Sequence, residues 1–125
     1  MEAIDAAYMA GLFDGEGSVD YKQRMERKKK HKGEGTRETL VWNITCEMAM
    51  TDEDTVKWFH KKVGTGRVNM LDKSKQAGGK PHHKMQWRWR TSHREALKFA
   101  KSLIPYAKTK KEKLRKIIKH YETSL

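Results

Sequence analysis

The hydrophobic pattern of this chain changes its period along the sequence, and this change constrains the fold more than any other feature. Residues 3–13 place apolar side chains at helical spacing, whereas from Ser18 onward apolar and polar residues alternate as in a β-strand. A second alternating stretch covers residues 39–50. The run at 27–37 between the two is rich in Lys and Gly and predicts a loop. The first part of the chain therefore predicts a helix followed by a β-hairpin.

The rest of the chain loosely repeats this order of helix and two strands. Its predicted elements are a helix after Thr51 that stops at Gly64, strands over 67–73 and 84–90 around a turn at 74–82, a helix from Ser92 to Pro105, and a basic helix over 110–121. We therefore expect an α+β fold of αββαββα(α) order in a single domain spanning residues 1–125. Its two hairpins would form one four-stranded antiparallel sheet with helices on one face.

The other face of the predicted sheet is polar and basic on its better strands. Such a face suits the major groove of duplex DNA, where Lys, Arg, Gln and Asn side chains pair with base edges. A strand of about ten residues spans roughly 33 Å, close to one turn of duplex. The side chains that we expect to contact DNA are Asp20, Lys22, Arg24, Glu26, Asn43, Thr45, Arg67, Asn69, Gln86, Arg88 and Arg90.

The charge of the chain also indicates a polyanionic partner. Lys and Arg number 28 against 16 Asp and Glu, which gives a formal net charge of +12. A highly charged soluble surface is the alternative interpretation. No segment is long and apolar enough for a bilayer, so we expect no membrane partner. The N-terminus lacks the basic start and apolar stretch of a signal peptide, and we expect an intracellular protein.

Two acidic residues stand where the first helix gives way to the first strand. Asp14 and Glu16 lie near the C-terminal end of that helix, where the helix dipole disfavours negative charge. A bound cation would explain them, because a hard divalent ion prefers oxygen ligands such as the Glu16 carboxylate and the Gly15 carbonyl. As alternatives, Asp14 holds the turn or caps a partner's helix, and Glu16 is a solvated turn residue.

The same helix carries a stripe of small residues and a neighbouring stripe of large ones. The small stripe would let another backbone approach closely, and the large one would cover the sheet. Two copies of the helix packed through their small stripes would bring two Glu16 side chains together and create a symmetric metal site. The small stripe is Ala3, Ala7 and Gly11, and the large one is Ile4, Tyr8 and Leu12, with Met9 and Phe13 beside it.

The stretch from Met9 to Ser18 resembles the LAGLIDADG signature of homing endonucleases, with Met for the first Leu, Phe for Ile, Gly for the second Ala and Glu for the second Asp. The segment from Leu103 to Lys110 is similar to the basic turn after the last core helix of single-motif members. This resemblance implies a homodimeric enzyme whose motif helices form the dimer interface, encoded in an intron or an intein or by a free-standing gene. It also implies Mg²⁺-dependent hydrolysis of phosphodiesters, with a staggered double-strand break in a long, near-palindromic DNA site.

The resemblance further implies roles for individual residues. Matched onto this chain, Glu16 binds Mg²⁺ or another divalent ion, and Asp14 belongs to the catalytic set. A basic residue beyond the proline polarises the scissile region. This residue is Lys110, with its neighbour Lys108 as an alternative, or Lys110 is simply one more lysine in a basic helix. No small-molecule cofactor is implied.

One position departs from the family's pattern. Members often carry a polar residue near the end of the second strand that orders water in the active site. The matching position here is Met48, with Glu47 beside it, and the sequence leaves open which residue takes the role. Two other functions remain as alternatives, namely a non-cleaving nucleic-acid binder on the same scaffold, such as a splicing cofactor or regulator, and a basic structural or RNA-packaging protein.

Overall fold

A computed structural model of the chain describes residues 1–29, 35–72 and 85–122. Its elements are α1 (Ala3–Glu16), β1 (Gly17–Lys29), β2 (Thr36–Met50), α2 (Glu53–Val63), β3 (Arg67–Asp72), β4 (Met85–Ser92), α3 (His93–Leu103) and α4 (Lys111–Glu122). This order confirms the predicted α+β fold. The predicted turn at 74–82 and the middle of the predicted loop at 27–37 lie outside the described residues, and β1 and β2 extend further into that loop than predicted.

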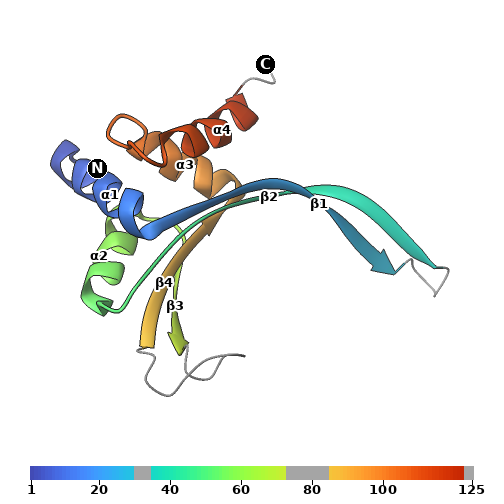
Figure 1. Cartoon of the computed structure of the whole chain (residues 1–125), viewed down its shortest axis with the longest axis horizontal. Helices are drawn as coiled ribbons and strands as arrows, with labels where there is room; N and C mark the ends of the chain where they lie inside the picture. Colours follow the sequence, from blue (N-terminus) through green and yellow to red (C-terminus); the bar gives the residue numbers. More distant parts are fainter. Residues whose placement is uncertain (30–34, 73–84, 123–125) are drawn as a thin grey trace.

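The four strands form one antiparallel sheet in the order β1-β2-β4-β3. The β1–β2 hairpin is a long, curved ribbon that reaches well past the helices, and the β3–β4 hairpin leaves the helical end in another direction (Figure 1). The outer part of each hairpin therefore lacks a helix to cover it. Met85, which we predicted to point inward, is 42% exposed for this reason.

The core lies between the helices and the inner end of the sheet, and aromatic rings join its layers. The Phe13 ring of α1 packs edge-on against Phe99 of α3, with 5.0 Å between centroids. Trp89 of β4 lies 4.7 Å from Phe99 and 4.9 Å from Phe59 of α2. All four rings are buried, and truncating one such side chain costs about 3–5 kcal/mol. This cluster fixes α1, α2 and α3 against the same strand.

The face that α1 turns to the core is only partly the predicted one. The buried residues of α1 are Ala6, Met9, Ala10 and Phe13. Met9 and Phe13 of the predicted large face are thus buried and Leu12 packs against the core, but the prediction was wrong for Ile4 and Tyr8, which are 76% and 56% exposed. Since α1 is apolar on most sides, its sequence does not mark one face for burial. Its rotation is set by the direct connection into β1 and by the contact of Phe13 with Phe99.

Cys46 of β2 lies in this core, as the sequence suggested. Burial raises the pKa of its thiol to about 12, so the thiolate is essentially absent at neutral pH and the sulfur is unreactive. In the part of the chain that the structure describes, no helix combines the length and the apolar character needed to cross a membrane.

Gly64 and Gly66 allow a direct test of the packing around Trp89. Both have positive φ, +82° and +93°. A Cβ at Gly64 meets open space, whereas one at Gly66 would lie 2.6 Å from Trp89 Nε1 and 2.7 Å from the Arg90 carbonyl oxygen. It would also disturb the 2.9 Å hydrogen bond that Trp89 Nε1 donates to the Thr65 carbonyl.

We expect Gly64→Ala to lower the free energy of unfolding by about 1–2 kcal/mol through backbone strain alone. Gly66→Ala should lower it by roughly 1 kcal/mol or more beyond that value, because its Cβ also collides with Trp89. Urea unfolding curves of the two variants measure the difference. Equal losses would contradict the tight packing between Gly66 and Trp89.

Candidate active site and nucleic-acid interface

Helix α1 passes into β1 without a loop, and Gly17 makes this junction possible. Its N–H donates to the Phe13 carbonyl and closes the last helical turn. A Cβ at Gly17 would lie 2.6 Å from that carbonyl oxygen and would also collide with the Phe13 ring, so no side chain fits. The helix ends at Glu16 and not at Phe13 as predicted. Asp14, Gly15 and Glu16 therefore occupy its last turn.

Asp14 ties this turn to the segment before α4. Its Oδ2 accepts a 2.8 Å hydrogen bond from the Lys108 N–H, and its Oδ1 accepts a 3.0 Å bond from the Lys110 N–H. The Thr109 hydroxyl donates to the Asp14 carbonyl oxygen at 3.1 Å. Both carboxylate oxygens thus hold a turn 94 to 96 residues away, a structural role that differs from the predicted ones of holding the local turn or capping a partner's helix. Its catalytic role stays a prediction.

The contact with Asp14 also places the side chain of Lys110. Its Nζ donates to the Asp14 carbonyl oxygen at 3.1 Å, at the end of α1 where unpaired carbonyls carry partial negative charge. Lys110 is half-buried, while Lys108 is exposed and contributes its main-chain N–H to the same anchor. Of the two predicted candidates, Lys110 is the one whose ammonium group the structure brings to the acidic end of α1.

Glu16 and Gly15 are exposed at this end of the helix. Among the described residues, the Glu16 carboxylate has no hydrogen-bond or ion-pair partner, so its oxygens are available to a cation. In the same residues, no group of three or more His, Cys, Asp or Glu side chains could hold a metal ion. One copy of the chain therefore offers the Glu16 carboxylate and the Gly15 carbonyl. A hard divalent ion would complete its shell with phosphate and water oxygens or with ligands from a second copy.

The pleat of the sheet puts Met48 and Glu47, near the end of β2, on opposite faces. Met48 is 1% exposed and belongs to the core, whereas Glu47 pairs with Ser18 in register and lies on the open face. Glu47 Oε2 accepts hydrogen bonds from Arg90 Nε at 3.0 Å and Nη2 at 2.9 Å, and Arg88 Nε lies 3.9 Å away. Glu47 is absent from the predicted DNA contacts, although the alternation of β2 already places it on the polar side.

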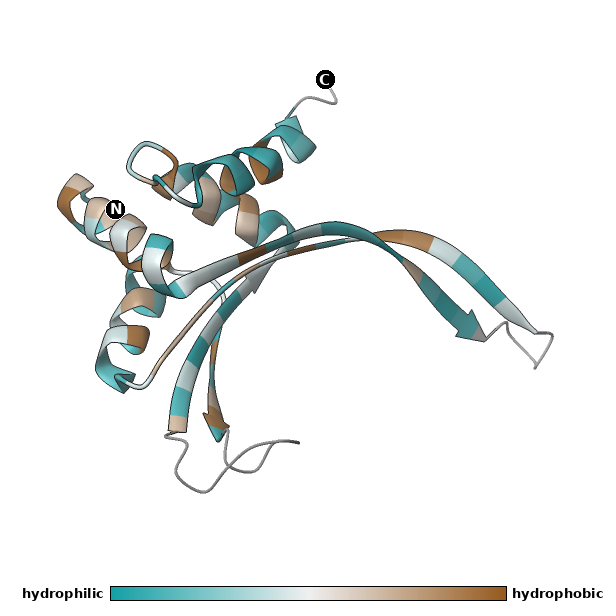
Figure 2. Cartoon of the chain, in the orientation of Figure 1, coloured by the Kyte–Doolittle hydropathy of each residue, from teal (hydrophilic) through white to brown (hydrophobic). Residues whose placement is uncertain are grey.

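The open face of the sheet gathers all eleven side chains that we predicted to contact DNA. Strand alternation and the observed register put them on the face opposite the helices. Figure 2 shows hydrophilic residues recurring along both hairpins. One row runs across the whole face in the order Ser18, Glu47, Arg90 and Arg67. This row links the strand next to the acidic end of α1 to the far edge of the sheet.

The acidic side chains on this face are matched by basic or amide groups. Asp20 accepts a hydrogen bond from Asn43 and lies 3.7 Å from Lys22. Lys28 contacts Glu26 at 3.0 Å, and its hydrogen bond and charge hold the pKa of the Glu26 carboxyl below the ordinary value. The face therefore combines donors and acceptors with an excess of positive charge, which is the pattern that recognises bases and phosphates together.

The outward side of α1 is a separate surface. Ala3, Ala7 and Gly11 are all exposed, and a Cβ at Gly11 meets nothing within 4 Å. Ile4 and Tyr8 lie beside them, and Tyr8 packs edge-on against Trp58 of α2 at 5.3 Å between centroids. The chain thus exposes both small and large apolar residues on one helix, on the side opposite the core.

Comparisons with known proteins show which solved structures share this fold. No family model and no curated protein sequence matches the chain. A crystal structure of the homing endonuclease I-CvuI in complex with the I-CreI target matches with a TM-score of 0.65 at 16% identity, over 96% of this chain and 69% of that one.

Two further solved structures agree with this match. The archaeal intron-encoded homing endonuclease I-Vdi141I complexed with DNA gives a TM-score of 0.64 at 14% identity, over 94% of this chain and 66% of that one. The LAGLIDADG meganuclease I-CpaMI bound to uncleaved DNA gives 0.62 at 14% identity, over 91% of this chain and 34% of that one. The chain therefore has the LAGLIDADG homing-endonuclease fold over nearly its whole length.

The hydrogen bonds that Asp14 accepts should protect two main-chain N–H groups from hydrogen exchange. In Asp14→Ala, the N–H groups of Lys108 and Lys110 lose their acceptors, so their hydrogen exchange should accelerate and unfolding should become easier by about 1–3 kcal/mol. Thr109→Val serves as the control, because it removes only the hydroxyl bond to the Asp14 carbonyl and keeps both N–H acceptors. Unchanged exchange at residues 108 and 110 in Asp14→Ala would contradict the anchoring role.

Proposed function

We propose that this chain is one subunit of a homodimeric, site-specific DNA endonuclease that depends on a divalent metal ion and makes a staggered double-strand break in a long, near-palindromic site. The observation that carries this proposal is the exposed Glu16 carboxylate. It has no partner among the described residues, and it lies in the last turn of α1, where the Asp14 carbonyl oxygen holds the Lys110 ammonium group, next to a polar and basic sheet face. The similar solved structures are described as homing endonucleases with DNA, which supports DNA as the substrate.

Mg²⁺ fits the donors at the end of α1. The Glu16 carboxylate and the Gly15 carbonyl are hard oxygen ligands, and both are exposed. When bound, the ion would neutralise phosphate charge and lower the pKa of a coordinated water. Lys110 would stabilise negative charge that develops on the scissile phosphate, since its ammonium group is already held at this end of α1. Glu47 would orient water through its carboxylate, which Arg90 fixes in place.

A homodimer would be formed through the outward side of α1. The small side chains of Ala3, Ala7 and Gly11 allow two helices to approach closely, and the exposed apolar surface around Ile4 would be covered. Two α1 helices packed in this way would place both Glu16 carboxylates near a common axis. Each copy would then serve one of the two phosphodiesters, and two open faces would together cover about two turns of duplex.

A nucleic-acid binder without cleavage is the second function that the sequence left open. Such a protein needs the basic sheet face but does not need a free carboxylate at the end of α1. The exposed Glu16 favours cleavage, because a carboxylate at a helix C-terminus without a partner among the described residues is unfavourable for stability.

Substitution of Glu16 separates cleavage from binding. A target is first selected for binding from a random-sequence DNA pool and is then incubated with Mg²⁺ and protein. We expect Glu16→Gln to slow cutting by about 100-fold or more while binding is retained, since only the ligand charge is removed. The control is Glu112→Gln, which removes an exposed acid from α4 and should cut normally. Normal cutting by Glu16→Gln would refute the metal assignment.

A large residue on the small stripe should split the dimer. Gly11→Leu has space in the isolated chain and raises helix propensity, so the subunit itself should stay folded. Sedimentation should nevertheless show a monomer, because the leucine separates the two helix backbones. Lys113→Leu adds the same side chain to an exposed position of α4 and should remain dimeric. A monomeric wild-type protein would contradict the dimer.

A further inference from the structure

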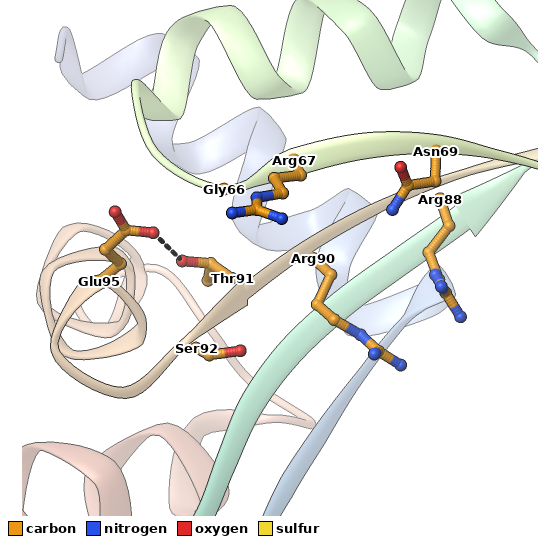
Figure 3. Close-up of a pocket in the computed structure, with 8 residues that line it drawn as sticks. All are labelled: Gly66, Arg67, Asn69, Arg88, Arg90, Thr91, Ser92 and Glu95. Atoms are coloured by element: carbon orange, nitrogen blue, oxygen red, sulfur yellow. Dashed lines mark hydrogen bonds between the residues drawn. The ribbon is translucent and has the colours of Figure 1, made fainter.

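A cavity of about 350 Å³ opens at the edge of the sheet, where β3 begins beside the end of β4 and the start of α3 (Figure 3). Three arginines line it, Arg67, Arg88 and Arg90, against one acidic residue, Glu95. The Thr91 hydroxyl donates to the Glu95 carboxylate at 3.5 Å, on the helix side of the cavity. The lining thus carries more positive than negative charge.

The three arginines differ in what they already bind. Arg88 and Arg90 share the Glu47 carboxylate on β2. The guanidinium of Arg67 points another way, toward the side of the cavity where Thr91 and Glu95 lie (Figure 3). Within the described residues Arg67 makes no hydrogen bond or ion pair. Its charge is therefore the one in this cavity that no acid of the described chain neutralises.

Other donors at the cavity also lack a protein acceptor. The Ser92 side chain makes no capping bond to α3. Arg88 Nε is buried without a hydrogen-bond partner, since its distance of 3.9 Å from Glu47 is too long for one. The buried Arg88 Nε is covered by protein atoms, whereas the Ser92 hydroxyl is a donor available to an oxygen-rich ligand in the cavity.

The position of the cavity in the sheet indicates which ligand this is. Strand β3 is an edge strand, whereas β2 and β4 lie in the middle. Four strands spaced about 4.8 Å apart are roughly 14 Å wide, and the major groove is about 12 Å wide. With the open face in the groove, the middle strands face the bases, and the edge strand meets the sugar-phosphate wall.

We propose that this cavity holds one phosphate of the DNA backbone, bound by the Arg67 guanidinium with the Ser92 hydroxyl as a second donor. Arg67 would then position the duplex without reading its sequence, unlike the side chains of β2 and β4. The proposal rests on the proposed function, because it assumes that the open face binds duplex DNA. The sequence pattern grouped Arg67 with side chains that pair with base edges, whereas here Arg67 contacts the backbone.

The test measures the affinity for duplexes of random sequence, about 30 base pairs long, across a series of salt concentrations without divalent ions. A phosphate contact contributes about 0.9 to the slope of log K against log salt. We expect Arg67→Ala to reduce the slope by about 1 and to weaken binding by a similar factor on every sequence. Arg67→Lys should keep the slope, because it keeps the charge. Arg115→Ala, which removes an exposed arginine of α4, should leave both unchanged.

The remaining outcomes separate the two proposals. If Arg67→Ala keeps the wild-type slope and relaxes the preference for one base pair, Arg67 reads a base and the phosphate site is wrong. The site is also wrong if Arg67→Ala, shown to be folded by its circular dichroism, binds like the wild type. If the wild-type protein binds no duplex DNA at all, the proposed function fails first and this inference fails with it.

Discussion

The anchoring of the Lys108–Lys110 turn by Asp14 is the interaction on which the candidate site depends. Two main-chain N–H groups and the Lys110 ammonium group converge on one residue of α1, from a segment 94 to 96 residues further along the chain. A carboxylate near a helix C-terminus is unfavourable on its own, and these donors offset that cost. Without them, the Lys110 ammonium group would lose its contact with the end of α1.

The helix-to-strand junction adds a second constraint to the same place. Because Gly17 permits α1 to run directly into β1, the last turn of the helix and the first residues of the open face form one continuous surface. Glu47 lies beside Ser18 in the neighbouring strand, and the row continues through Arg90 to Arg67. The end of α1 and the open face of the sheet are thus joined through hydrogen-bonded strands, with no loop between α1 and β1.

The arginines of the open face differ in whether an acidic residue holds them. Glu47 engages Arg88 and Arg90 in the middle of the sheet, while Arg67 at the edge has no partner among the described residues. Guanidinium groups held in one orientation lose less entropy when they bind, which favours selective contacts. A free guanidinium at the edge suits a contact that only positions the duplex.

Local patterns in the sequence were sufficient for the order of elements and for the eleven side chains of the open face. Because side chains alternate along a strand, the sequence alone places Arg88 and Arg90 on one face of the sheet and Trp89 on the other. The motif at residues 9–18 is also a local pattern, because its residues are consecutive in the chain. It therefore identified the acidic end of the first helix without knowledge of the tertiary structure. Only the tertiary structure decided the rotation of α1, the exposure of Ile4 and Tyr8, and the placement of Lys110 over Lys108. These depend on contacts between residues far apart in the chain, and a helix that is apolar on most sides carries no local signal for them.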